Sequence, residues 1–225
     1  MYSRAVILCA AAALLAVSAV PADDKPAADK PDKPKAPLKE GADLPGPFRP
    51  YNVANGKYEN KFHSLTNEHG LNPGVLVFVQ NVPTTEEKSP LVGLLHELDK
   101  YITERPETRL KAFAVFLFPD MPDVVKDDDI RESHIQELQK LKSATPPLQQ
   151  LVLALDSPAS LQKAGYEMPP TEQVRVVLYN QLKVAAKDEK KKAQGIYDFE
   201  KGLTDADVKK IMDDVKTNLA PYKKR

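Results

Sequence analysis

The chain has 225 residues, enough for one domain of ordinary size with additional segments. It carries 32 lysines and arginines against 32 aspartates and glutamates, so its charge balance favours neither a nucleic-acid partner nor a charged membrane surface. Neither G-x-x-x-x-G-K-[ST] nor G-x-G-x-x-G occurs in the sequence, which argues against a nucleotide-dependent enzyme.

Residues 1–22 have the pattern of a secretory signal peptide. Arg4 precedes an apolar run from Ala5 to Val20, which closes on small residues. The run is shorter than the roughly 20 residues that span a bilayer, so we expect cleavage and no membrane span afterwards. The single cysteine, Cys9, lies within this run. The mature protein is therefore expected to be exported, periplasmic or extracellular, and free of disulfide bonds.

Residues 23–47 repeat Pro, Lys, Asp and Ala with almost no large apolar side chain. Such a segment buries too little surface to offset its loss of conformational entropy, and its prolines favour extended polyproline II. We expect this segment to be a disordered spacer. The folded domain is then expected to comprise residues 48–225.

Short apolar runs alternate with helical patterns through the middle of the chain. Strands are predicted at 75–79, 111–118 and 151–156, with helices between them at 91–102 and 130–141. In the first helix Leu91, Leu94 and Leu98 recur on one face with the 3.6-residue period. Strands without polar alternation, separated by helices, indicate a parallel sheet covered on both faces.

The last third of the chain changes this order. A strand predicted at 173–180 is followed almost at once by another at 182–187, too soon for a crossover helix, so the two form an antiparallel hairpin. A final helix begins after Thr204, a capping residue with acidic residues behind it. A short helical turn is also expected near Ser160. The predicted fold class is therefore α/β: a central mixed sheet of three parallel strands plus a C-terminal β-hairpin, with helices on both faces.

This order resembles the thioredoxin fold, in the form found in the alkyl hydroperoxide reductase and thiol-disulfide exchange groups. The strand that ends at Asp156, the Gly165-Tyr166 pair and the hairpin resemble the family's segment around its cis-proline, and the resemblance extends from about Pro73 to Leu219. It implies that partners dock in extended form at the loop before the hairpin. The residues expected there are a cis Pro170, an apolar wall of Met168 and Pro169, and the polar Thr171.

The family's redox cysteines have no counterpart in this sequence. In a group of secreted bacterial thioredoxin-like proteins that the chain resembles, a Cys-x-x-Cys pair precedes a Gly and, three residues later, a Pro. Gly70 and Pro73 keep this spacing and place the two cysteine positions on Ser64 and Asn67. In ordinary thioredoxins the pair follows the strand, which corresponds here to residues 80–90, also without cysteine. Either placement implies a redox-inactive protein, because exchange requires a thiolate and a second thiol.

Other chemistry is weakly indicated. The spacing of His63, Glu68 and His69 matches neither H-E-x-x-H nor H-x-x-E-H, so no metal site is expected, and His63 and His69 are kept as candidate binding residues. Ser64 lacks the G-x-S-x-G elbow of many hydrolases. We therefore expect no catalytic residue and no cofactor.

The sequence thus favours an exported, redox-inactive thioredoxin-fold protein that binds a peptide or protein partner. Two alternatives stay open. One is a chaperone-like or structural protein of an envelope assembly, tethered by the spacer. The other is an enzyme with unrecognised catalytic groups, such as His63, Ser64 or Thr84. The sequence does not specify the partner.

Overall fold

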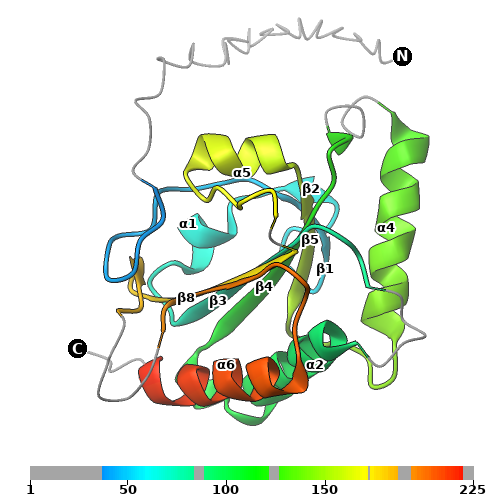
Figure 1. The fold of residues 1–225 in the computed structure, drawn as a ribbon. Coiled ribbons are helices and arrows are strands. Elements are labelled where there is room, and N and C mark those ends of the chain that lie inside the picture. The colour runs from blue at the N-terminus through cyan, green and yellow to red at the C-terminus, as the bar shows by residue number, and fades with distance from the viewer. Residues whose placement is uncertain (1–36, 84–88, 122–126, 172, 187–193, 220–225) are drawn as a thin grey trace, which may run out of the picture. The chain divides into compact units, whose positions relative to one another are not determined.

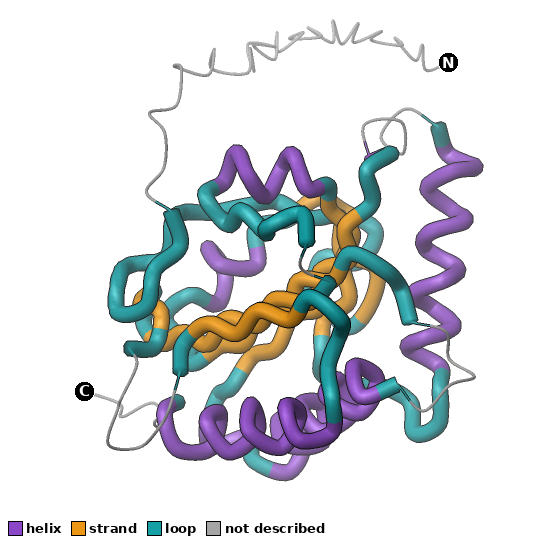
Figure 2. Tube along the Cα trace, viewed as in Figure 1, coloured by secondary structure: helices purple, strands orange, loops and turns teal. Residues whose placement is uncertain are grey.

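The computed structural model describes residues 37–83, 89–121, 127–171, 173–186 and 194–219. The described residues form one unit with a central sheet and helices on both sides (Figures 1 and 2). The expected signal peptide and the first part of the expected spacer lie outside the described residues. Within the described ranges no helix is long and apolar enough to cross a membrane.

The sheet of the described chain is mixed and has eight strands. The strands are β1 (Tyr51–Ala54), β2 (Lys61–Phe62), β3 (Gly74–Val79), β4 (Lys111–Leu117), β5 (Val152–Asp156), β6 (Val174–Asn180), β7 (Lys183–Val184) and β8 (Ile196–Phe199). Their order is β2-β1-β5-β4-β3-β6-β7, and β8 also pairs with β6. Strands β3, β4 and β5 are parallel, while β6 is antiparallel to β3 and forms the predicted hairpin with β7.

Helices cover both faces of this sheet, as Figure 1 shows. They are α1 (Leu65–His69), α2 (Pro90–Glu104), η1 (Pro106–Thr108), α4 (Asp128–Ser143), α5 (Pro158–Ala164) and α6 (Asp205–Asn218). One core cluster joins α2, α4 and α6 to the sheet, and a second joins α1 and α5 to the opposite face. Every residue of β3 is buried, with Val77 facing the first cluster and Phe78 the second. This is the environment expected for strands without polar alternation.

Among the described helices, α1, α4, α5 and α6 begin at side-chain caps. Asp127 accepts the backbone N–H groups of Asp129 and Ile130 and so caps α4. Thr204 and Asp207 form a reciprocal capping box at α6. At α5, Ser157 is the N-cap and Gly165 ends the helix with φ of 87°, a conformation that suits glycine.

Residues 37–44 belong to the expected spacer, and in the structure they pack on the domain. We call this segment the strap. Its backbone pairs with β7 and the preceding turn: Gly41 N–H donates to Val184 O at 3.2 Å, and Leu44 N–H to Leu182 O at 2.7 Å. Leu44 is buried, and Leu38 packs against the core beneath α5. These two leucines and the unpaired edge of β7 supply the stabilisation that composition alone did not indicate.

Candidate functional site

The loop after β3 and the loop before β6 meet at one end of the sheet. Val79 pairs with Val174, and Gln80 N–H donates to Gln173 O at 3.0 Å. A pocket of about 270 Å³ opens beside this pair, and we call it the β3–β6 pocket. It is lined by Val79, Asn81, Val82, Pro83, Ser89, Pro90, Leu91, Gln173, Val174, Lys201, Gly202 and Leu203. The site therefore joins the end of β3, the start of α2, the start of β6 and the turn between β8 and α6.

The chemistry of the β3–β6 pocket suits binding. Its walls are mainly aliphatic, and its polar side chains are Asn81, Ser89, Gln173 and Lys201. Ser89 is the N-cap residue of α2 but makes no capping hydrogen bond, so its hydroxyl can interact with a ligand. The described lining residues include no cysteine, histidine or carboxylate. They offer hydrogen bonds and one positive charge, without a thiolate or a general base.

The candidate residues His63 and His69 lie on either side of Glu68. His63 Nε2 is 3.0 Å from Glu68 Oε2, without hydrogen-bond geometry, and His69 Nε2 is 3.7 Å from Glu68 Oε1. His69 stacks on Phe113 with ring centroids 5.8 Å apart. Burial lowers the pKa of His69, which favours its neutral form. Among the described residues no group of three or more His, Cys, Asp or Glu side chains is arranged to hold a metal ion.

Ser64 and Asn67 occupy the first turn of α1. Ser64 is the buried N-cap residue, and its Oγ accepts the backbone N–H of Asn67 at 3.4 Å. Helix α1 precedes β3, whereas residues 80–90 follow it, so the two suggested placements of the redox pair are different sites. Within the described chain no hydrogen bond joins the Ser64 hydroxyl to His63 or His69. Ser64 therefore serves as a helix cap in this structure.

The prediction of a cis peptide bond at Pro170 is wrong. The cis bond found in the described ranges precedes Pro146, so the bond before Pro170 is trans, the form that X-Pro bonds favour by about 0.5–1 kcal/mol. Met168 packs partly against the core beneath α5, Pro169 is half-buried, and Pro170 and Thr171 are exposed. These four residues lie on the segment that leads to Gln173, but none of them lines the β3–β6 pocket.

Comparisons with known proteins address the fold. No protein-family model matches the chain, and no curated protein matches its sequence. A Chlorobium tepidum protein assigned as the thiol:disulfide interchange protein DsbE matches in structure with a TM-score of 0.50 and 11% identity, over 81% of this chain and 99% of that one. The fold is thioredoxin-like.

Two further structures match more weakly. A 2-Cys peroxiredoxin from Plasmodium vivax gives a TM-score of 0.47 at 12% identity, over 80% of this chain and 83% of that one. BsSco, of the Sco family of cytochrome c oxidase assembly proteins, gives a TM-score of 0.45 at 13% identity, over 85% of this chain and 100% of that one. This chain departs from the thioredoxin-like redox pattern in one decisive respect: with Cys9 as its single cysteine, it has no Cys-x-x-Cys pair.

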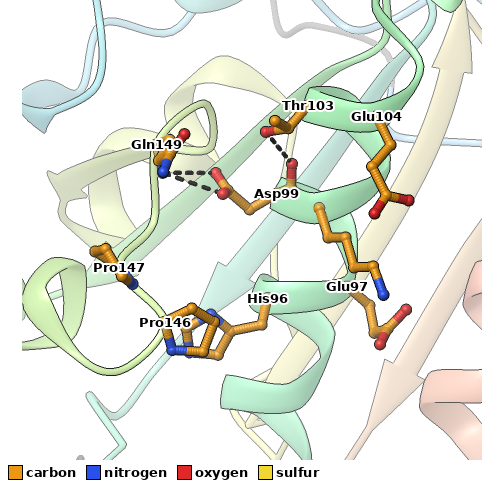
Figure 3. A pocket seen from close by; sticks show the side chains of 9 residues that line it. His96, Glu97, Asp99, Thr103, Glu104, Pro146, Pro147 and Gln149 are labelled. Carbon is orange, nitrogen blue, oxygen red and sulfur yellow. Dashed lines mark hydrogen bonds between the residues drawn. The ribbon is translucent and has the colours of Figure 1, made fainter.

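A second pocket, of about 420 Å³, lies between α2 and the segment after α4 (Figure 3). His96 and Pro146 lie on one side, and Asp99 lies toward Gln149. The Asp99 carboxylate accepts backbone N–H groups of Gln149, Gln150 and Leu151, so it is a structural clamp in the thioredoxin-like fold. The remaining charged residues of this pocket are exposed, which makes it the weaker candidate site.

Sequence reasoning missed Gln173, Lys201 and Asp99. Gln173 was assigned to a strand, and Lys201 lies in a turn whose position depends on β8, which was not predicted. Asp99 is one polar residue on an otherwise apolar helix face. A buried acidic residue at an apolar helix position is a usable signal, because such a carboxylate needs hydrogen-bond donors.

Proposed function

We propose that this protein is an exported, redox-inactive thioredoxin-like protein that binds an extended peptide segment of a partner at the β3–β6 pocket. The hydrogen bond from Gln80 to Gln173 carries the proposal, because it unites the loop after β3 with the loop before β6 beside an open pocket. The absence of a second cysteine supports binding without thiol exchange.

The pocket also has suitable chemistry for a peptide. Aliphatic walls around Val82 and Leu91 can accept an apolar side chain, while the Gln173 and Asn81 amides can pair with peptide groups. Lys201 adds one positive charge, so a peptide with an acidic residue near its apolar anchor is favoured. Export is supported by the signal-like pattern of residues 1–22.

The test is selection of phage-displayed random heptapeptides on the purified protein, followed by fluorescence anisotropy with labelled peptides. Gln173→Ala and Lys201→Glu should each weaken the selected peptides about tenfold, which corresponds to about 1.4 kcal/mol. Lys209→Glu, an exposed charge reversal on α6, is the matched control and should leave affinity unchanged. Failure to select any binder, or equal affinity for all variants, would place the function elsewhere.

A further inference from the structure

Strand β8 presents main-chain groups at an open edge of the sheet. Gly195 lies opposite Leu178, whose N–H donates to Gly195 O at 2.8 Å, and Tyr197 lies opposite Val176. In an antiparallel ladder, main-chain groups alternate between the two sides of a strand. The carbonyl of Gly195 and the main-chain groups of Tyr197 and Phe199 are therefore directed toward β6, whereas those of Ile196 and Asp198 are directed away.

The contact with the strap agrees with this orientation at Ile196, and the Gly195 N–H also turns toward the strap. Glu40 Oε1 accepts the N–H of Ile196 at 3.3 Å and that of Gly195 at 2.8 Å. On the N-terminal side of Glu40 the strap runs away from this edge, because the Leu38 N–H donates to Gly165 O beneath α5. The strap thus covers the β7 half of the edge and stops at the first residue of β8.

Further along β8, three outward-facing main-chain groups have no hydrogen-bond partner in the described residues. They are the carbonyl of Ile196 and both the N–H and the carbonyl of Asp198, for which no hydrogen bond is found in the described part of the chain. Natural sheets usually cover or protect such edges, as the strap does for β7. An extended strand can add to such a row of donors and acceptors, and its backbone then supplies affinity.

We propose that the partner segment adds as a strand to β8 at Ile196 to Asp198 and continues into the β3–β6 pocket. The proposal rests on the proposed function and identifies how that partner is held. Continuity supports it, since Lys201, Gly202 and Leu203 follow β8 directly in the chain and line the pocket. A single extended peptide can therefore make both contacts.

The side chains of β8 define the chemistry of the partner. On one face, the Tyr197 and Phe199 rings lie parallel with centroids 6.4 Å apart; Tyr197 is buried in the core, so the partly exposed Phe199 alone gives an apolar flank. On the other face Asp198 is paired with Arg175, so its carboxylate is already neutralised. The partner is an extended segment with an apolar side chain beside Phe199. An open edge of three residues is too short for a stable pair of copies of this chain, which needs about 1,200 Å² or more of buried surface.

The decisive experiment compares Asp198→Pro with Asp198→Ala. Both variants remove the ion pair with Arg175, but only proline removes the outward N–H, and proline is tolerated where an edge N–H faces solvent. With a labelled heptapeptide selected on the original protein, Asp198→Pro should bind about tenfold more weakly than Asp198→Ala. Peptide addition should also slow hydrogen exchange of the Asp198 amide in the original protein.

The outcomes separate this inference from the proposed function. If Gln173→Ala weakens the peptide while Asp198→Pro and Asp198→Ala bind equally, the pocket is correct and strand addition to β8 is wrong. If pocket variants have no effect while Asp198→Pro does, the edge binds peptides and the proposed pocket is wrong. A dimer of the original protein in sedimentation, with the Asp198 amide protected without peptide, would make a second copy the occupant and overturn the proposal.

Discussion

The carboxylate of Asp99 on α2 accepts the backbone N–H of Leu151 at 2.8 Å, directly before β5 begins. The same carboxylate accepts the N–H groups of Gln149 and Gln150, at distances down to 2.6 Å. Asp99 and Leu151 are buried, so replacing the carboxylate would leave the Leu151 N–H without an acceptor and without access to bulk water. One side chain therefore fixes the entry of a central strand against a helix that is distant in the sequence.

Replacing this carboxylate should destabilise the protein strongly. Asp99→Asn keeps the shape but points an amide donor at backbone donors, and a loss of about 3 kcal/mol in the free energy of unfolding is expected. Urea denaturation followed by circular dichroism measures it. Glu97→Gln, an exposed change on the same helix, should stay within about 0.5 kcal/mol. Equal stability of the two variants would show that the clamp contributes little.

The strap should contribute measurable stability through Glu40. Glu40→Ala leaves the Gly195 and Ile196 N–H groups without their carboxylate acceptor, so we expect a loss of about 1–2 kcal/mol. Lys39→Ala is the neighbouring control, because that exposed side chain makes no such contact. Limited proteolysis gives a second readout: the resistant fragment should begin near Pro37. A resistant fragment that begins near Phe48 would instead favour the boundary expected from composition.

The sequence predicted the central elements well because burial on both faces leaves a strong pattern. The strand predicted at 75–79 is β3 at Gly74–Val79, and the helix predicted at 91–102 is α2 at Pro90–Glu104. The cap at Thr204 was also correct. Each of these signals is local, because it depends on neighbouring residues within one element.

The elements that were missed depend on distant partners. Strand β8 has only four residues, and it is a strand because it pairs with β6 across the sheet. The strap is ordered by β7 and by a leucine contact beneath α5, although its composition is that of a spacer. The predicted second hairpin strand, at 182–187, shortens to Lys183–Val184 in the described chain. For the same reason the candidate site could not be predicted in full, since Lys201 can be placed only once β8 is known.

The protein should lack thiol-disulfide exchange activity. The chain has one cysteine, in the expected signal peptide, and neither α1 nor residues 80–90 contain another. In a dithiothreitol-coupled insulin assay, the rate should equal the uncatalysed background. The double variant Ser64→Cys with Asn67→Cys should form an intramolecular disulfide under mild oxidation, because Ser64 Oγ already contacts the Asn67 N–H. Turnover by the original protein would contradict redox inactivity.

Acid should destabilise the protein through His69. Burial lowers the pKa of this imidazole in the folded state, whereas the unfolded chain titrates near the ordinary value of about 6.5. The unfolded state therefore binds more protons as the pH falls below about 6.5, and stability is lost in that direction. The charged groups that face His69 are Glu68, which raises its pKa, and Lys111, His63 and Lys57, which lower it.

The measurement is the free energy of unfolding of His69→Gln between pH 7.5 and 5. This variant should lose less stability on acidification than the original protein, because glutamine does not titrate. His96→Gln, a substitution on α2, is the control for a change of imidazole at another site. An unchanged acid dependence in His69→Gln would assign the effect to other groups.

Asp156 at the end of β5 should show the opposite pH dependence. Burial raises the pKa of its carboxyl group, even though Oδ1 accepts the Ser157 N–H at 2.8 Å. The Ser160 side chain also lowers this pKa, but burial is the larger effect. The folded state therefore holds a proton more tightly than the unfolded chain, whose aspartates titrate near 3.9. Stability then falls as the pH rises from about 4 through the raised pKa, and the charged carboxylate remains a cost at neutral pH.

Asp156→Asn removes this charge and retains an oxygen for the Ser157 N–H. We expect the variant to be more stable than the original protein at pH 7, with the difference shrinking toward pH 4, where the native carboxyl is protonated as well. Urea denaturation at both pH values measures this, with the exposed Asp213→Asn on α6 as the control. If Asp156→Asn were less stable at both values, the protonated carboxyl would be donating a hydrogen bond that the amide cannot replace, and burial of charge would not be the dominant effect at this position.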